Sequence, residues 1–158
     1  GKGKIQENNK AIIEKMEAEK KRKEEEFAAN QQKLVDQLKA GMQSTPSGLY
    51  YKITKTTNGI APKAGDQVSV HYAGRLVDGS EFDSSFKRNQ PIDIPIGMGQ
   101  VIKGWDEGIL LLKEGETATL LIPSELGYGA RGAGGVIPPN AWLVFDVELV
   151  KVKSNAVK

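Results

Sequence analysis

The sequence lacks cysteine and long hydrophobic runs, and it contains a single histidine. Without cysteine, the chain can form no disulfide, no thiolate metal site and no cysteine nucleophile. The one histidine, His71, has no second histidine or carboxylate at metal-ligand spacing beside it, so we expect no metal site. No run of about 18 apolar residues occurs, so no transmembrane helix is predicted.

An excess of charge of one sign is also missing. The 22 basic and 20 acidic side chains give a formal net charge of +2, which provides no electrostatic basis for binding nucleic acid or an acidic membrane. Gly1 does not begin a secretory signal and no initiator methionine is present, so we expect a mature form or an excised fragment of a longer protein. The length of 158 residues suits one compact domain plus a smaller element.

The first part of the chain predicts a long helix. Between Lys4 and Met42 there is no proline and almost no glycine, and the strong helix formers Glu, Lys, Ala and Gln dominate. The apolar residues form two groups around a solvated middle: Ile12, Ile13 and Met16, then Leu34, Leu38 and Met42. Their spacing does not sustain a coiled-coil repeat. We interpret the helix either as a charged spacer or as an arm that dimerises or holds other polypeptides through one of these groups.

A cluster of turn-forming residues, QSTPSG at 43–48, marks the end of this helix. We therefore predict a helical arm at residues 1–43, a linker at 44–47, a domain at 48–153 and a short tail at 154–158.

Within the predicted domain, apolar and polar residues alternate in three segments, at 49–54, 68–72 and 143–149. This alternation is typical of strands with one buried face. The pair Asp78-Gly79 is a hairpin signal between two further strand-like stretches.

One short helix interrupts the strands. Trp105, Ile109 and Leu112 share one helical face, and we expect Gly115 to end the helix. Several strands with one helix indicate an α+β fold: an antiparallel twisted sheet wrapped around one short helix and preceded by the long charged helix.

More than half of the aromatic residues lie in three blocks of this domain. The blocks read VSVHYAGRLVDGSEFDSS from Val68, VIKGWDEGI from Val101 and LGYGARGAGGVIPPNAWLVFDVEL from Leu126. They hold six of the ten aromatic residues, and five of these are candidates for a site: Tyr72, Phe82, Trp105, Tyr128 and Phe145. We expect these rings to converge between sheet and helix as an apolar pocket for a small ligand or a peptide side chain. The same rings would also serve as ordinary core.

One acid, Asp83, directly follows a ring of this expected pocket. Two interpretations stay open. Asp83 either caps the turn that ends its strand, or it is a carboxylate at the pocket rim held by Tyr72, Arg88 or Tyr128.

The sequence offers no activated nucleophile. Strand alternation places His71 on the face opposite Tyr72, so we expect no histidine to reach Ser84 or Ser85. The residues therefore favour binding, or a reaction that needs no covalent chemistry.

Residues 127–132, GYGARG, match the G-x-G-x-x-G pattern of dinucleotide-binding loops. Pro138 and Pro139 follow instead of the helix N-terminus that would meet a pyrophosphate, so we predict no nucleotide binding. We expect the glycines to form a flexible loop whose Val136 and Ile137 close over the pocket.

The blocks VHYAGRLVDGSEFDSS, VIKGWDEGI, GYGARGAGGVIPPN and LVFDVEL closely resemble the FKBP-type peptidyl-prolyl cis-trans isomerases. The resemblance covers about residues 48–153, roughly two thirds of the chain. The charged helix before them is similar to the bacterial branch of macrophage infectivity potentiators and periplasmic chaperones. The resemblance implies an FKBP-like fold and a peptidyl-prolyl isomerase that assists protein folding without a cofactor. It favours a periplasmic or cell-envelope location over the cytoplasm.

The resemblance also implies a site, with Trp105 as its floor and with the Ile102 backbone N–H and the Tyr128 hydroxyl bonded to substrate carbonyls. The catalytic set that it implies is Tyr72, Phe82, Asp83, Trp105, Tyr128 and Phe145. The implied substrate-binding set is Arg88, Ile92, Val101, Ile102, Val136 and Ile137, and no residue is implied as a metal ligand. Ile92 departs from the family, which often has an aromatic wall residue at this position.

The implied partners are unfolded or proline-containing polypeptides and the macrolide inhibitors of the family, with no nucleic acid and no membrane span. In the bacterial branch such helices mediate dimerisation and hold unfolded clients, so a homodimer through the helix is an expectation. Two other functions remain as alternatives: a holdase-type chaperone in which the isomerase pocket is secondary, and an interaction scaffold with a vestigial pocket. The intact aromatic set argues against the scaffold.

Overall fold

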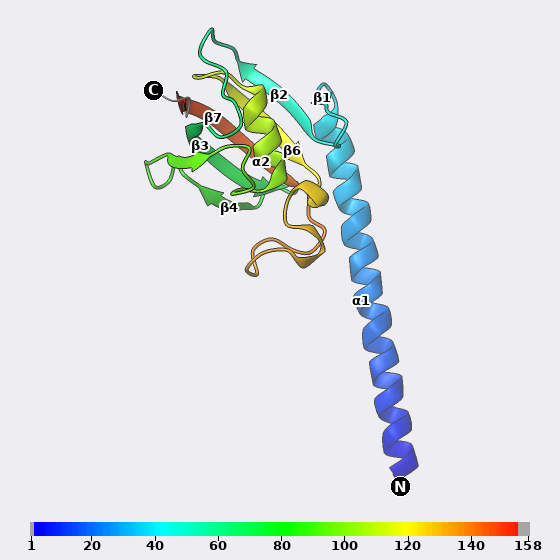
Figure 1. Ribbon diagram of the computed structural model, residues 1–158. Coiled ribbons are helices and arrows are strands. Elements are labelled where there is room, and N and C mark those ends of the chain that lie inside the picture. Colours follow the sequence, from blue (N-terminus) through cyan, green and yellow to red (C-terminus); the bar gives the residue numbers. More distant parts are fainter. Residues whose placement is uncertain (1, 155–158) are drawn as a thin grey trace.

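The computed structural model describes residues 2–154; residue 1 and residues 155–158, which form most of the predicted tail, lie outside the described part. A long helix, α1 (Lys2–Lys39), projects from an α+β domain (Figure 1). The strands are β1 (Gln43–Ser44), β2 (Tyr50–Lys55), β3 (Gln67–Leu76), β4 (Glu81–Ser84), β5 (Ile92–Pro95), β6 (Thr117–Ile122) and β7 (Leu143–Lys153). Helix α2 (Lys103–Gly108) continues as a 3-10 turn at Ile109–Leu111, and further 3-10 turns span Ser124–Leu126 and Gly129–Arg131.

The strands form one antiparallel sheet in the order β1-β2-β6-β7-β3-β4, with β5 also paired to β3. Helix α2 lies across one face of this sheet (Figure 1). The predicted fold class, an antiparallel sheet wrapped around one short helix, is therefore confirmed. The predicted hairpin joins β3 to β4: Gly79 has a φ of 97°, and the Ser80 N–H donates to the Asp78 carboxylate at 2.9 Å.

The main core lies between the sheet and α2. Trp105, Ile109 and Leu112 are 4%, 0% and 1% exposed, so the predicted apolar helix face is the buried one. The helix is shorter than the sequence predicts, because it tightens into a 3-10 turn at Ile109 and Leu112 already has an extended backbone. Gly115 therefore lies in the following turn, with a φ of 90°, and does not end the helix.

Two glycines allow α2 to lie close to strand β6. A Cβ on Gly104 would come within 2.6 Å of the Ile122 side chain, and a Cβ on Gly108 within 2.7 Å of Leu120. The two glycines are one helical turn apart, so they clear the same side of α2. This close packing fixes the height of Trp105 above the sheet.

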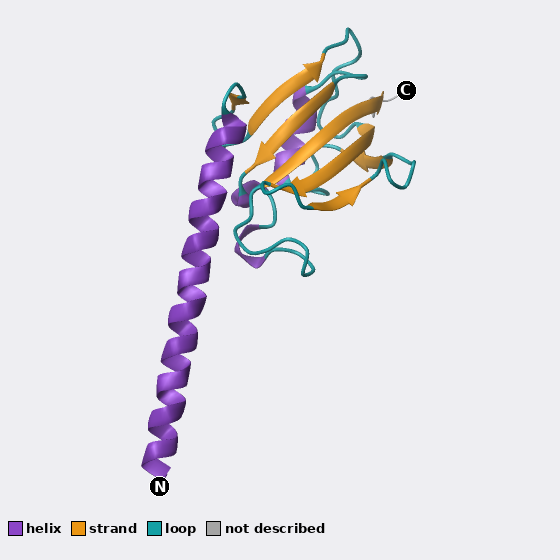
Figure 2. Cartoon of the chain, turned by 180° about the vertical axis from the view of Figure 1, so that it is seen from behind, coloured by secondary structure: helices purple, strands orange, loops and turns teal. Residues whose placement is uncertain are grey.

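Helix α1 has an exposed part and a docked part. Residues 3–30 are all exposed, including Ile12, Ile13 and Met16. Further along, Val35 is 1% exposed and packs with Leu121 of β6 and Val144 of β7. Alternation places these two strand residues on the sheet face opposite α2, and Figure 2 shows the C-terminal end of α1 beside the sheet while the rest of the helix projects beyond it.

The apolar group at the end of α1 is not a free surface. Leu38 and Met42 pack onto the cluster of Val35, Leu121 and Val144. The expectation that this group is available for dimerisation or client binding is therefore wrong for Leu38 and Met42, whereas Leu34 is partly exposed and lines a hollow beside the β3–β4 hairpin. The reason is Val144, which the strand pattern assigns to the polar face of β7 and which is only 1% exposed under the helix.

The segment after α1 is an ordered turn. Strand β1 pairs with β2, the Thr45 N–H donates to the Leu49 carbonyl at 2.9 Å, and the Gly48 N–H donates to the Thr45 carbonyl at 3.0 Å. The hydroxyls of Thr45 and Ser47 donate to the Glu107 carboxylate of α2, at 2.7 and 2.6 Å. The base of the arm is thus fastened to the helix that carries Trp105.

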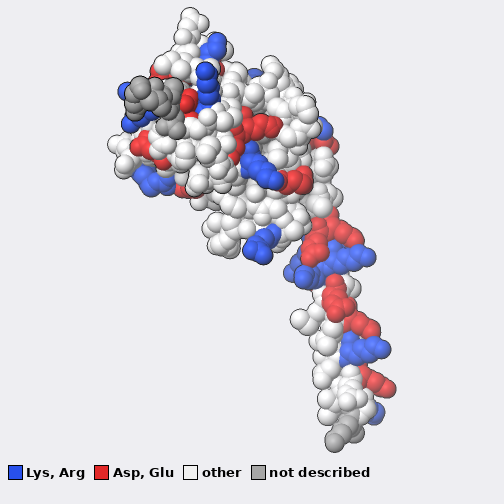
Figure 3. Space-filling view, viewed as in Figure 1, with Lys and Arg blue, Asp and Glu red and all other residues white. Residues whose placement is uncertain are grey.

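Acidic and basic side chains are interspersed on the face shown in Figure 3, most densely along α1. Within α1, Arg22 lies between Glu19 and Glu26 and pairs with both. None of the helices in residues 2–154 has the length and apolar composition needed to cross a bilayer.

Candidate functional site

Four aromatic rings, one each from α2, β3, β4 and β7, converge between α2 and the sheet. The centroid of the Trp105 ring lies 5.0 Å from that of Tyr72 on β3 and 5.4 Å from that of Phe145 on β7. The interplanar angles are 78° and 86°. The ring centroids of Phe82 on β4 and Phe145 are 5.6 Å apart, and their interplanar angle is 83°. These edge-to-face arrangements are the ones that aromatic quadrupoles favour. The rings form a rigid apolar cluster.

A glycine makes room for the rings. Gly74 is buried on β3 opposite Phe145 in the register of β3 and β7. A Cβ there would lie 2.6 Å from the Phe145 ring and 2.8 Å from the Phe82 ring. Sequence reasoning missed Gly74; its signal was a glycine at an inward position of a strand.

Asp83 is held at the edge of this cluster. The Tyr72 hydroxyl donates to its carboxylate, and Arg88 donates to the same carboxylate at 2.7 Å and to the Tyr72 hydroxyl at 2.9 Å. The Ser84 N–H also donates to Asp83, at 2.9 Å. These contacts support the second interpretation, a carboxylate held by Tyr72 and Arg88. The bond from Ser84 comes from the adjacent residue within β4, so it does not cap the turn that follows the strand.

These contacts set the charges at the site. Burial alone would raise the pKa of Asp83, but the hydrogen bonds from Tyr72, Arg88 and Ser84 and the Arg88 charge outweigh it, so this pKa is lowered. Burial and the hydrogen bond to Asp83 raise the pKa of the Tyr72 phenol. At neutral pH the site therefore presents a fixed carboxylate and a protonated phenol.

The indole N–H of Trp105 lacks a hydrogen-bond partner and is the only buried side-chain polar atom among residues 2–154 in this state. Leaving such a donor unpaired costs about 1–3 kcal/mol. The other buried polar side-chain atoms of residues 2–154 have hydrogen-bond partners, so an unpaired donor of this cost needs a structural or functional reason.

Residues of the loop after β6 differ in how deeply they are buried beside the rings. Ile137 is 5% exposed and belongs to the same core cluster as the rings, whereas Val136 is 57% exposed. Tyr128 is 40% exposed, and within residues 2–154 its ring makes no contact with the other four. The expected convergence of five rings thus holds for four of them.

The remaining expected binding residues lie around the core. Ile92, Val101 and Ile102 are partly buried and pack against it. Sequence reasoning missed the residue that orders the loop before Val101: the Asp106 carboxylate accepts the N–H groups of Gly97 and Gly99, both at 2.8 Å. The available signal was an acid in the first turn of a helix that follows a glycine-rich loop.

The expectation that no histidine reaches the serine pair is wrong. His71 Nδ1 lies 2.9 Å from Ser85 Oγ, because Ser85 continues the β4 ladder beside Tyr72. Ser85 is 0% exposed, and its Oγ accepts the Tyr72 N–H at 2.7 Å. A hydroxyl buried and engaged in this way cannot attack a substrate, so Ser85 is not a candidate nucleophile even though a histidine contacts it.

The glycine-rich loop does not lead into a helix. Its Gly129–Arg131 turn is followed by a bridge between Ala133 and Ile137. No group of three potential His, Asp or Glu metal ligands gathers within residues 2–154.

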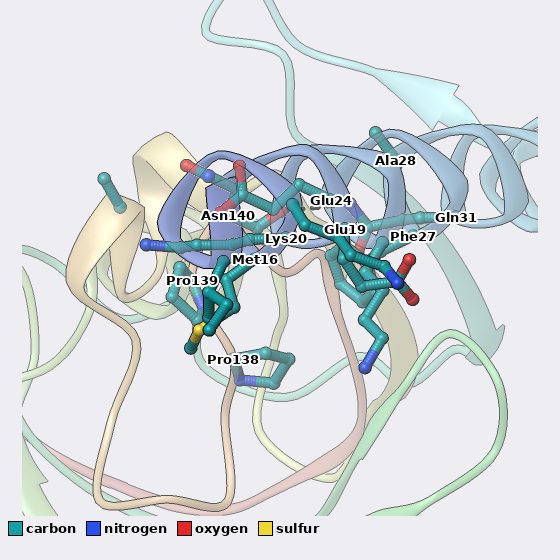
Figure 4. Close-up of a pocket in the computed structure, with 14 residues that line it drawn as sticks. Met16, Glu19, Lys20, Glu24, Phe27, Ala28, Gln31, Pro138, Pro139 and Asn140 are labelled. Atoms are coloured by element: carbon teal, nitrogen blue, oxygen red, sulfur yellow. Dashed lines mark hydrogen bonds between the residues drawn. The ribbon is translucent and has the colours of Figure 1, made fainter. Parts of the chain in front are cut away.

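Two hollows lie beside α1, away from the rings. The larger, of about 1070 Å³, has Ile12, Met16 and Phe27 on one wall and Pro138 and Pro139 on the other (Figure 4). The smaller, of about 580 Å³, lies where α1 passes the β3–β4 hairpin. The larger hollow shares the loop 128–140 with the ring cluster.

Residues 58–150 match the family model described as FKBP-type peptidyl-prolyl cis-trans isomerase. FK506-binding protein 1 of Dictyostelium discoideum is 57% identical over 106 residues, which cover 67% of this chain and 99% of that protein. The isomerase FkpA of Aeromonas hydrophila is 46% identical over 153 residues, which cover 97% of this chain and 54% of that protein.

Among solved structures, FkpA from Escherichia coli superposes with a TM-score of 0.75 at 36% identity, covering 96% of this chain and 73% of that one. The likeness to FkpA thus includes the helical arm as well as the domain. The chain spans about half the length of its FkpA relative from Aeromonas.

Proposed function

Because the chain belongs to the FKBP-type peptidyl-prolyl cis-trans isomerase family, we propose that it catalyses rotation about X-Pro bonds in polypeptide clients and so assists their folding. Rotation about a peptide bond has a barrier of about 18–20 kcal/mol, because amide resonance is lost in the twisted state. The two isomers of an X-Pro bond differ by only about 0.5–1 kcal/mol, so lowering the barrier is sufficient.

The site suits a reaction of this kind. A twisted amide has less charge separation than a planar one, so a dry aromatic environment stabilises it relative to water. Hydrogen bonds that fit only the twisted geometry add further stabilisation of the transition state. Neither a nucleophile nor a general base is required, and the fixed protonation states of Asp83, a carboxylate, and Tyr72, a neutral phenol, agree with this.

We assign the residue roles on this basis. Trp105 is the floor beneath the prolyl ring, Tyr72, Phe82 and Phe145 are its walls, and Asp83, positioned by Arg88, supplies a negative charge at its edge. The Ile102 backbone N–H and the Tyr128 hydroxyl donate to substrate carbonyls. Apolar contacts to flanking residues come from Ile92, Val101, Val136 and Ile137.

The observation that carries the proposal is the buried, unpartnered indole N–H of Trp105 within the ring cluster. We expect a peptide bound over the indole ring to change the environment of this donor. The indole ¹H–¹⁵N resonance of Trp105 should then shift when an X-Pro peptide is titrated in, while that of Trp142 should not.

The direct test is exchange NMR on an X-Pro peptide with and without the protein. We expect faster cis/trans exchange with the wild type. Trp105→Phe, which keeps an aromatic ring but removes the N–H donor, should reduce this acceleration. An exchange rate unaffected by the wild-type protein would defeat the proposed activity. A macrolide of the family is the proposed competitive ligand, and it should suppress the acceleration.

A second function, holding unfolded clients, is favoured by the exposed apolar residues of α1. Ile12, Ile13 and Met16 are 56%, 53% and 65% exposed, and Ile12 and Met16 also line the larger hollow. Grouped exposed apolar side chains of this kind mark interaction surfaces. The same surface is our proposed site for a homodimer.

Client holding and dimerisation are both tested with full-length protein in which Ile12, Ile13 and Met16 are changed to serine. Loss of aggregation suppression with unchanged peptide exchange supports client holding by the arm. Light-scattering mass measurement on the same samples tests the dimer, since the triple variant should then have half the mass of the wild type.

The relatives that match across the arm are bacterial proteins. We propose a periplasmic or cell-envelope location for this chain as well. Fractionation of the source cells, followed by detection of the protein with an antibody, tests this proposal.

A further inference from the structure

The arm is hydrogen-bonded to the backbone at the end of the loop that we place over the substrate. Gln31 lies one helical turn before Val35, so it faces the domain. Its Nε2 donates to the Asn140 carbonyl at 3.0 Å, and its Oε1 accepts the Trp142 N–H at 2.9 Å. One planar amide therefore joins α1 to two backbone groups more than a hundred residues further along the chain.

Asn140 closes the base of the loop 128–140. Its N–H donates to the Gly129 carbonyl at 2.9 Å, next to Tyr128. Its φ of 61° lies in the left-handed region, which asparagine tolerates better than most residues other than glycine. This backbone conformation is held on one side by Gly129 and on the other by Gln31.

Hydrogen bonds within the loop connect its base to the ring cluster. The Gly132 N–H donates to the Tyr128 carbonyl at 3.1 Å, and Ala133 and Ile137 exchange two backbone bonds of 2.9 and 3.0 Å. Ile137 then packs in the core with the rings. Figure 4 shows Gln31, Asn140 and the two prolines that follow Ile137 around the same hollow.

We infer that Gln31 is a positioning residue for the isomerase: by holding Asn140 and Trp142, it keeps the loop 128–140 in the conformation that binds the prolyl substrate. The inference rests on the proposed function. Asn140 is exposed and Trp142 is partly exposed, so water can replace the amide when it is removed. The fold then persists, while the fraction of molecules with a binding-competent loop falls, and apparent substrate affinity falls in the same proportion.

The test compares Gln31→Met with Gln32→Met in the full chain. The first substitution keeps the length of the side chain and a strong helix former but removes both hydrogen bonds. Gln32 is the matched control, because its amide bonds only to Asp36 on the same helix. For an X-Pro peptide we expect Gln31→Met to raise KM about threefold to fivefold with kcat within about twofold of the wild type. Gln32→Met should change neither.

Amide hydrogen exchange supplies a readout that does not depend on turnover. The Ala133, Ile137 and Asn140 amides should exchange at least about threefold faster in Gln31→Met, because the fraction of molecules with an open loop rises as the binding-competent fraction falls, while those of Leu120 and Phe145 stay unchanged. Gln31→Glu retains the acceptor for Trp142 but not the donor for Asn140. It should match Gln31→Met, because the Asn140 contact is the one that closes the loop.

An unchanged KM together with unchanged loop exchange overturns the inference. So does a loss of kcat and stability at constant KM, because that pattern shows a purely structural role. If the wild type shows no isomerase activity, the proposed function fails separately. Faster loop exchange in Gln31→Met would even then support positioning of the loop by the arm, and unchanged exchange would overturn it.

Discussion

The domain and the outer arm are stabilised by different interactions. The domain buries a continuous core between α2 and the sheet, whereas residues 3–30 of α1 are all exposed. The outer arm depends on helix propensity and on local pairs such as Arg22 with Glu26, at 2.5 Å, which contribute only about 0.2–0.5 kcal/mol each. A helix without a packed face is marginal in water. Substitutions in the two parts should therefore affect different properties.

The largest expected effect separates the ring cluster from the outer arm. Trp105→Ala should lower the free energy of unfolding by about 3–5 kcal/mol and abolish catalysis, because a large buried ring is replaced by a cavity. Ile13→Ala, at a side chain that is 53% exposed, should change that free energy by less than about 0.5 kcal/mol. Urea denaturation and peptide exchange measured on both variants check this. Similar losses in the two would refute the division.

The next largest effect concerns the junction between the two parts. Val35→Ala should lower the free energy of unfolding by about 2 kcal/mol, because Val35 is 1% exposed where α1 meets the sheet. Val150→Ala is the control, since Val150 is 38% exposed on β7. If the two valine variants unfold at the same urea concentration, the junction does not stabilise the fold. When urea is added to the wild type, we also expect the outer arm to unfold first. The helical circular dichroism signal should then begin to fall at a lower urea concentration than the one at which tryptophan fluorescence changes.

A smaller effect is expected at the exposed side of the site. Tyr128→Phe should lower kcat/KM about threefold to tenfold, the range for one lost hydrogen bond to substrate, and leave stability unchanged. Tyr51→Phe is the control, because the Tyr51 hydroxyl bonds to Gln43 outside the site. Peptide exchange kinetics on both variants provide the measurement. A fully active Tyr128→Phe would remove the hydroxyl from the proposed mechanism.

The smallest effect is the pH dependence contributed by Asp83. Its pKa is lowered in the folded state, so its contribution to stability is present above the unfolded pKa of about 3.9 and is lost as pH falls through the folded pKa. Asp83→Asn should therefore cost no more than about 1 kcal/mol at pH 7, because the pair with Arg88 is half exposed. The difference from wild type should shrink as pH falls below the unfolded pKa of about 3.9 and through the lower folded pKa. A difference that is constant across this pH range would contradict the assignment.

Sequence patterns predicted the domain well where one period dominates. The alternation in β3 and β7 placed Tyr72 and Phe145 inside, and the helical spacing of α2 did the same for Trp105. Composition alone predicted α1, which has no competing signal. In each case a local repeat is enough to determine which face is buried.

The same patterns failed where burial depends on a distant element. Val144 reads as a polar-face residue of β7, and only the docking of α1 buries it. The contact of His71 with Ser85 depends on the register between β3 and β4. The bonds of Gln31 to Asn140 and Trp142 have no sequence signal, because an exposed helical glutamine usually faces solvent. Contacts of this kind follow from the three-dimensional packing of elements, which a repeat does not encode.

The anchored base of α1 has a geometric consequence for anything that associates with its far end. Helix α1 has 38 residues, or about 57 Å at 1.5 Å per residue. A tilt of about 10° at the base would move the far end by about 10 Å. Inserting seven residues before Phe27 would carry Ile12 about 10 Å outward on nearly the same azimuth, whereas inserting five would turn it by about 140°. The length of this one helix can therefore change the distance of Ile12 from the domain and the direction in which Ile12 faces separately.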